Sequence, residues 1–311
     1  MDETITYRDP SVNTRQFQDR LTIMFFLLPS FLLFIIFVIY PIVQSLYYSF
    51  FNWKGFGPAV DFVLLDNYSR ILTDKVFLIS LKNGGIVIAL SLLIQLPLSL
   101  LIALTVGNTH VPGRAFFRTI FFMPYIFSEV IAAIMWLGLY NPDPDRGLFN
   151  AIILLLFGDV KPITWLSNTN MVVACIFVVL TWKYFGFYML LFMTGLQNIP
   201  SEIDEAAQID GANRFQIFLF ITLPLLASTI RTCVYLSVLG SLQQFILVWI
   251  MTKGGPVNAS EMMATYMYRY GFVRFSLGYG AAVAIVMFVI CLTFSIIYQR
   301  LTPQYDHLGG Y

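Results

Sequence analysis

Long apolar runs separated by short polar segments make up most of the chain. A helix that crosses a membrane needs roughly 20 predominantly apolar residues, and six runs meet this length, at about 21–48, 85–106, 119–140, 171–196, 223–251 and 277–301. The apolar run 148–157 is too short to cross, so we expect it at the membrane interface or against the bundle. The pattern predicts an all-α membrane protein with six transmembrane helices in residues 21–301 and polar tails at 1–20 and 302–311.

Prolines fall within or at the ends of several of these runs. Membrane helices accept proline where neighbouring groups satisfy the carbonyl that it leaves free. We therefore expect kinks at Pro29, Pro41, Pro97, Pro124 and Pro224.

Composition agrees with a lipid-facing surface. Hydrophobic residues are 58% of the 311 positions and charged residues only 11%, whereas about 25% of a soluble domain is charged. The net charge of +1 gives no reason to expect nucleic acid as a partner. The three cysteines lie inside apolar runs and the two histidines, His110 and His307, lie far apart, so we predict no metal site and no catalytic cluster in this chain.

Charge does not determine the topology. Six crossings place both termini on one side, but seven lysines and arginines then fall on that side and nine on the other, which gives no positive-inside signal.

The polar loop at about 199–224, between the fourth and fifth runs, has the chemistry of a short helix, a turn and a second helix. Ser201 is expected to cap the first helix, and the acidic residues after it favour the positive end of the helix dipole. Ala206 and Ala207 are strong helix formers that let another surface approach closely, and Gly211 is suited to the left-handed conformation that ends a helix. Composition alone leaves an ordinary loop helix as an equal alternative.

The spacing within this loop resembles the EAA motif of permeases from binding-protein-dependent ABC importers. That motif reads EAA, two residues, DGA, eight residues and I-x-L-P, and the matching positions are Glu205, Ala206, Ala207, Asp210, Gly211, Ala212, Ile221, Leu223 and Pro224. The resemblance implies a cytoplasmic coupling helix seated in a cleft of the ATPase, with Glu205 in a salt bridge and Gly211 making the turn. It also implies that both termini are cytoplasmic.

Other segments resemble the carbohydrate-uptake permeases of this family, of the maltose-F-like or glycerol-phosphate-A-like kind. They are Leu65-Asp66-Asn67-Tyr68, Arg118 with Met123-Pro124 (methionine where leucine is usual), and Thr252-Lys253-Gly254-Gly255-Pro256 followed by Tyr266 and Tyr268. The sequence lacks the extra N-terminal helices and large outer domain of the maltose subunit.

The resemblance implies a multi-pass protein of a bacterial-type inner membrane that moves a sugar or oligosaccharide by alternating access. The implied partners are a second homologous permease, which makes a heterodimer, two ATPase subunits and an external solute-binding protein, besides membrane lipid. The chain contains no G-x(4)-G-K-[ST] segment, so we expect it to bind no cofactor, with ATP and Mg²⁺ on the ATPase. Glycerol phosphate or another polyol remains an alternative solute.

Polar groups in the middle of the runs are candidates for the solute pathway, because such groups are costly in a membrane. The third run offers Glu129 and Trp136, the fourth offers Lys183, Tyr184 and Tyr188, and the fifth offers Ser237, Gly240, Ser241 and Gln244. Helix–helix packing is the competing interpretation for each. We further predict that Glu129 and Lys183 pair across the third and fourth helices.

Two rival functions remain at this stage. A secondary transporter or channel would need inverted repeats or several carboxylates in mid-membrane, and only Glu129 qualifies. A membrane enzyme would need a catalytic cluster, which the sequence does not contain.

Overall fold

The structure of the protein is a computed structural model that describes residues 10–107, 112–158 and 160–302. Residues 1–9 and 303–311 of the expected tails, together with His110 and His307, lie outside the described residues. The described residues are helical apart from connecting loops and an isolated antiparallel bridge between Phe51 and Phe62.

The elements follow one another along the chain as helices, four of which are single π-helical turns (η). In order they are α1 (Pro10–Phe34), η1 (Ile35–Ile39), α2 (Tyr40–Tyr48), α3 (Asp66–Thr73), α4 (Lys75–Leu90), η2 (Ser91–Gln95), α5 (Leu96–Gly107), α6 (Arg114–Ile126), α7 (Glu129–Leu139), α8 (Leu148–Phe157), α9 (Val172–Gln197), α10 (Ser201–Ile209), α11 (Arg214–Ile217), η3 (Phe218–Thr222), α12 (Leu223–Leu225), α13 (Ala227–Leu242), α14 (Ile246–Met251), α15 (Met263–Tyr268), η4 (Arg269–Val273) and α16 (Leu277–Leu301).

Within the described ranges, five stretches are long and apolar enough to cross a membrane: Leu21–Tyr48, Lys75–Gly107, Val172–Gln197, Ala227–Met251 and Leu277–Leu301. A sixth arises if α6 and α7, which are bent by 100° at their junction, are taken as one broken span. The prediction of an all-α membrane fold is confirmed.

Two details of the predicted spans are wrong. The second already begins at Lys75, because Asp74 accepts hydrogen bonds from the amides of Val76 and Phe77 and so caps the helix there. The third, expected as one helix over 119–140, is broken at Phe127 and Ser128. The first span, Leu21–Tyr48, has the predicted bounds, although α1, which carries its first part, already begins at Pro10.

The predicted distortions at several prolines coincide with the π turns. The turns η1, η2 and η3 end just before Pro41, Pro97 and Pro224, respectively. Proline has no amide hydrogen and its ring clashes with the carbonyl one turn earlier, so the helix widens locally instead of breaking.

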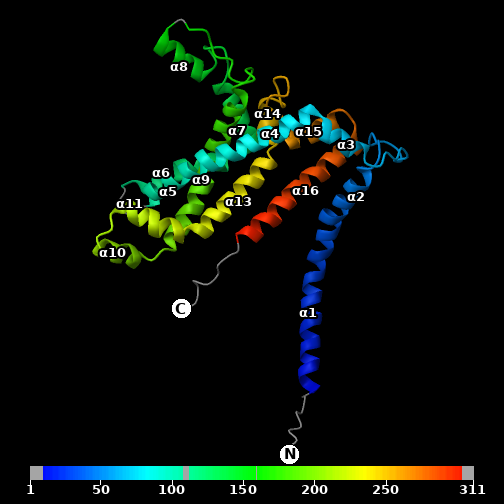
Figure 1. The fold of residues 1–311 in the computed structure, drawn as a ribbon, viewed down its shortest axis with the longest axis horizontal. Helices are drawn as coiled ribbons and strands as arrows, with labels where there is room; N and C mark the ends of the chain where they lie inside the picture. The colour runs from blue at the N-terminus through cyan, green and yellow to red at the C-terminus, as the bar shows by residue number, and fades with distance from the viewer. Residues whose placement is uncertain (1–9, 108–111, 159, 303–311) are drawn as a thin grey trace, which may run out of the picture.

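Helix α9 is the centre of the bundle. It packs against α5, α6, α7, α13 and α14, and 56% of its most apolar window is buried. In contrast, none of the corresponding window of Leu21–Tyr48 is buried, and α1 stands apart from the rest of the bundle in Figure 1. The short apolar helix α8 projects from the end opposite α10, and its place at the membrane interface stays a prediction.

The corner between α2 and α3 explains the Leu-Asp-Asn-Tyr segment in physical terms. The buried side-chain amide of Asn67 donates to the carbonyl oxygens of Ser49 (2.8 Å) and Phe51 (3.1 Å). The Tyr68 hydroxyl lies 2.6 Å from that of Ser49. These bonds satisfy backbone groups that the loop leaves without partners in the helix.

Candidate functional site

A cavity of about 450 Å³ lies in the bundle between α4, α9 and α13, beside the junctions α6–α7 and α13–α14. Its lining is Val87, Ser91, Gln95, Tyr125, Glu129, Leu180, Tyr184, Phe187, Tyr188, Leu236, Ser237, Gly240, Ser241, Gln243, Gln244, Phe245 and Ile246. Aromatic rings, hydroxyls, side-chain amides and one carboxylate therefore surround the same space. This combination suits a ligand with both hydroxyl groups and apolar faces.

Seven of the nine predicted pathway residues line this cavity: Glu129, Tyr184, Tyr188, Ser237, Gly240, Ser241 and Gln244. Helices far apart in the sequence thus bring the predicted groups together. Whether a solute touches them stays a prediction.

Trp136 and Lys183 are not part of the lining. The indole of Trp136 is buried among aromatic rings, with its centroid 5.4 Å from that of Tyr140, 5.9 Å from Phe149 and 5.6 Å from Trp182. It therefore packs within a core cluster of the bundle, which is the competing interpretation given for it.

Lys183 does not form the predicted salt bridge with Glu129, since the salt bridges of the described residues do not include this pair. Its ammonium donates instead to the carbonyl oxygens of Pro124 (3.2 Å), Tyr125 (2.7 Å) and Phe127 (2.5 Å). The last carbonyls of a helix have no partner within the helix and carry its negative end. The break after α6 therefore supplies three acceptors for the three donors of the lysine.

Glu129 occupies the other side of the same break. It lies in the first turn of α7, where a negative charge is favoured by the helix dipole, and its carboxylate accepts a hydrogen bond from the Tyr184 hydroxyl. Ser128 caps this helix by accepting from the Ile131 amide at 3.3 Å. The two opposite charges thus complement two helix ends and do not pair directly with each other.

Sequence reasoning missed Ser91, Gln95 and Tyr125 as lining residues. Ser91 and Gln95 begin and end η2, in the second span. Two polar residues four apart in an otherwise apolar run were the signal that could have identified them. Tyr125, at the end of α6, carried no comparable signal.

The loop 199–224 has the predicted helix–turn–helix form in α10 and α11. Helix α10 ends in a Schellman motif, in which the Ala212 amide donates to the Ala207 carbonyl (2.9 Å) and the Gly211 amide to that of Gln208 (3.1 Å). Gly211 has a φ of +87°, which glycine adopts without the penalty of a side chain. The predicted turn at Gly211 is confirmed.

The predicted cap at Ser201 is wrong. Pro200 occupies the N-cap position without a side-chain bond, and Ser201 is the first helical residue. The proline at 200 fixes the extended entry to the helix, so the serine is placed one position too late to cap. The second helix, α11, has the cap instead, because Asn213 and Gln216 bond each other's amides at 2.9 and 2.8 Å.

The remaining residues of the motif hold this loop or face outward. Ala207 is buried, while Glu205 and Ala206 are exposed on α10. Asp210, Gly211, Ala212 and Ile221 line a shallow hollow at the turn. Leu223 and Pro224 begin α12, with Leu223 half-buried and Pro224 exposed.

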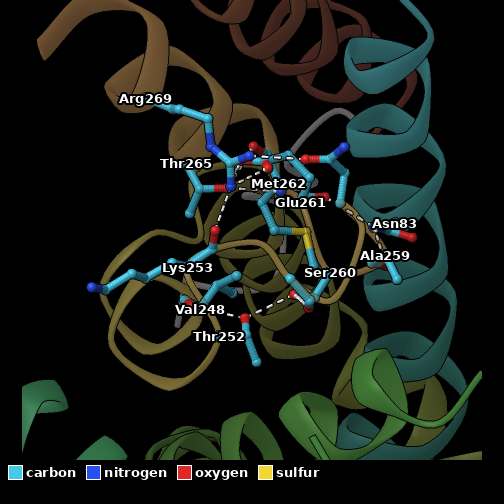
Figure 2. A network of polar contacts seen from close by, with 12 residues as sticks. Asn83, Val248, Thr252, Lys253, Ala259, Ser260, Glu261, Met262, Thr265 and Arg269 are labelled. Atoms are coloured by element: carbon cyan, nitrogen blue, oxygen red, sulfur yellow. Dashed lines mark hydrogen bonds and ion pairs between the residues drawn. The ribbon is translucent and has the colours of Figure 1, made fainter. Parts of the chain in front are cut away.

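The loop that joins α14 to α15 is braced by a buried ion pair (Figure 2). The Glu261 side chain is fully buried; its Oε2 atom lies 2.7 Å from Nη2 of Arg269 in the ion pair, and its Oε1 atom accepts from the Thr265 hydroxyl at 2.8 Å. Asn83 of α4 donates to the carbonyls of Ala259 (2.8 Å) and Glu261 (3.0 Å), which fixes the loop to the bundle. Burial raises the pKa of the Glu261 carboxyl, against the lowering effects of Thr265 and Arg269.

This brace accounts for the first glycine of the Thr-Lys-Gly-Gly-Pro segment. Gly254 has a φ of +79°, and a Cβ atom there would lie 2.7 Å from Nη2 of Arg269 and against the Glu261 carboxylate. Arg269 is engaged by Glu261 and also by Asn258 at 2.8 Å. The segment therefore shapes the loop.

Comparison with known proteins identifies the class of the chain. Residues 95–307 match the family described as binding-protein-dependent transport system inner membrane component. The sn-glycerol-3-phosphate transport system permease protein UgpA of Agrobacterium fabrum is 33% identical, over 90% of this chain and 94% of the relative. The diacetylchitobiose uptake system permease protein NgcF of Streptomyces coelicolor is 31% identical, over 87% of this chain and 80% of the relative.

A solved structure shares the fold. A chain of a bacterial alginate ABC transporter, in complex with a periplasmic protein bound to an alginate pentasaccharide, aligns with a TM-score of 0.80 at 22% identity, over 93% of this chain and 96% of that chain. The chain belongs to the family of inner membrane components of binding-protein-dependent transport systems.

Proposed function

We propose that the chain is one of two permease subunits of an ATP-driven importer that moves a sugar or oligosaccharide delivered by an external solute-binding protein. The observation that carries this proposal is helix α10. It is a short helix outside the bundle, and its exposed residues include Glu205 and Ala206. Ile209 of α10 and Phe215 of α11 are 87% and 70% exposed. Exposed apolar side chains beside a carboxylate are suited to contact another protein.

The partner that we assign to this surface is an ATPase. The chain contains no phosphate-binding loop of its own, so the energy for import must come from another subunit. The match to the EAA pattern supports Glu205 as the residue that forms a salt bridge there, with ATP and Mg²⁺ held by the ATPase.

The test is co-purification of the ATPase with this chain. We expect Glu205→Arg to lose the ATPase, because it places a positive charge where the salt bridge requires a negative one. Asp145→Arg is the matched control: it reverses an equally exposed carboxylate in the loop between α7 and α8 and should retain the ATPase. Equal retention by both variants would remove α10 as the docking site.

Helix α1 supports a second permease subunit. The most apolar window of the span Leu21–Tyr48 is wholly unburied within this chain, and the helix stands apart from its own bundle (Figure 1). We assign it to the interface with a homologous permease, with lipid around the remainder. A heterodimer of this kind would bring two bundles together around one pathway.

The arrangement of the helix ends supports cytoplasmic termini. The start of α1, the end of α16 and the loop helix α10 all lie towards the lower end of Figure 1, whereas α3, α8 and α15 lie at the upper end. If α10 contacts an ATPase in the cytoplasm, the two ends of the chain are also cytoplasmic. The outer loops then face the solute-binding protein.

The cavity supports a sugar as the solute. The rings of Tyr184 and Tyr188 can pack on the C–H faces of a sugar, and Gln95, Ser241 and Gln244 offer partners for its hydroxyls. In the alternating-access cycle that we propose, ATP-driven movement of α10 opens this cavity first to one side and then to the other. Binding of candidate sugars to the partner solute-binding protein tests the choice of solute.

A further inference from the structure

The cavity contains one charged side chain, the carboxylate of Glu129, and this charge has a consequence for the solute. The residues that line the cavity include no lysine, arginine or histidine. The carboxylate accepts from the Tyr184 hydroxyl, but a carboxylate has about four acceptor positions. It therefore keeps capacity to accept hydrogen bonds from a ligand.

Lys183 precedes the lining residue Tyr184 in the sequence, but its ammonium does not form an ion pair with the Glu129 carboxylate. Lys183 is only 4% exposed, and its three donors are engaged by the carbonyls of Pro124, Tyr125 and Phe127. An ammonium group has three donors and no more. It has none left for an acidic group on a solute.

Without Glu129, the break between α6 and α7 would be suited to bind an anionic group. In transporters with discontinuous helices, the positive N-terminus of a half-helix commonly faces an anionic group of the solute. Here the carboxylate of Glu129 lies in the first turn of α7 and already occupies that position. A second negative charge in the cavity would face this carboxylate in a medium less polar than water.

A further lining residue offers a donor to an oxygen of the ligand. The side chain of Gln244 is 7% exposed, and its Nε2 atom has no hydrogen-bond partner. Buried polar atoms normally have one, so this amide is suited to a ligand oxygen. It lies at the break between α13 and α14.

We propose that Glu129 makes the cavity selective for sugars without negative charge, either neutral or amino-bearing, and excludes phosphorylated and uronic sugars. The proposal rests on the sugar-import function proposed above and specifies its substrate class. Hydroxyl or ammonium donors of the solute would bind the carboxylate through charge-assisted hydrogen bonds. This distinguishes the chain from its relative named for sn-glycerol-3-phosphate and from the alginate transporter, whose named solutes are acidic.

The test uses the whole importer, purified with its partner permease and ATPase, and three probes with the same β-1,4-linked backbone. The probes are cellobiose, the disaccharide of glucosamine, and cellobiouronic acid, and binding is measured by equilibrium dialysis without the solute-binding protein. We expect the uronic acid to bind at least about tenfold more weakly than cellobiose, because like charges brought together are penalised. Glucosamine disaccharide should bind at least as well as cellobiose.

Two variants assign the effect to the carboxylate. Glu129→Gln keeps an acceptor for Tyr184 but removes the charge, and we expect it to reduce the discrimination to within about twofold. Glu129→Asp keeps the charge and should keep the discrimination. An unchanged preference in Glu129→Gln overturns the proposal, and so does equal binding of cellobiouronic acid and cellobiose by the parent importer, which needs no variant to fold.

The outcome also separates this proposal from the proposed function. If the parent importer binds none of the probes but its ATP hydrolysis still responds to its solute-binding protein, the assignment of the cavity fails and the importer function stands. If ATP hydrolysis shows no such response, the importer function itself fails.

Discussion

Replacing Lys183 by methionine removes the ammonium group and keeps a side chain of similar length in the core of the bundle. Three hydrogen bonds to the carbonyls of Pro124, Tyr125 and Phe127 are lost. Hydrogen bonds to a charged group contribute about 1.5–3 kcal/mol each. Against this, the variant no longer holds a charge at mid-membrane depth, which costs about 2.5–3.5 kcal/mol. The balance predicts a net destabilisation of about 1–6 kcal/mol.

The assay is thermal unfolding of the purified protein in detergent, followed by a thiol-reactive dye. Cys175 and Cys233 are buried, so they react when the bundle opens. We expect Lys183→Met to lower the melting temperature by at least about 2 °C, whereas Lys82→Met, at an exposed position of α4, should leave it nearly unchanged. A melting temperature of Lys183→Met equal to or above that of the parent would refute the reasoning, because the three carbonyls would then not need the ammonium.

Two other substitutions test packing and charge separately, one at Gly186 and one at Arg269. Gly186→Ala should destabilise the protein by about 1–3 kcal/mol, because the new Cβ would lie 2.8 Å from the carbonyl carbon of Phe121. The control Gly85→Ala should be neutral or slightly stabilising, because nothing lies within 4 Å of a Cβ atom at that position. Equal losses for the two variants in the same melting assay would contradict this prediction. Arg269→Gln removes a charge that lowers the pKa of the buried Glu261 carboxyl. In the variant, Glu261 should therefore bind a proton more readily in the folded form than in the unfolded form. The variant should regain stability as the pH falls from about 8 to about 5.5. A melting temperature of Arg269→Gln that falls over this pH range, relative to the parent, would exclude that account.

Hydrophobic pattern was sufficient to predict the membrane fold, because a run of apolar residues long enough to cross a membrane has few alternatives to a helix. It did not reveal the break at Phe127 and Ser128. Pro124 indicated a kink, but the same signal at Pro41 and Pro97 accompanies only a π turn within a continuous span. At the break, the carbonyls of Pro124, Tyr125 and Phe127 accept from the ammonium of Lys183, which lies in another helix and is far from them in the sequence.

The same limit applies to the candidate site. Tyr184 and Tyr188 share a helix face with each other, so their spacing indicated a common surface. The partners of Lys183 could not be inferred in this way, because backbone carbonyls become acceptors only where a helix ends, and the end itself was not predicted. Gly211 was predicted correctly because a left-handed turn is a local property of one residue.

The bend between α6 and α7 also restricts how the protein can move. In a straight helix, the carbonyls of Pro124 and Tyr125 would accept from amides one turn further along the same helix. The ammonium of Lys183 would then be buried without acceptors, at a cost of several kcal/mol. Straightening this span would therefore cost several kcal/mol. We expect the α6–α7 bend and the segment of α9 around Lys183 to move together, so that the change of access takes place at other joints.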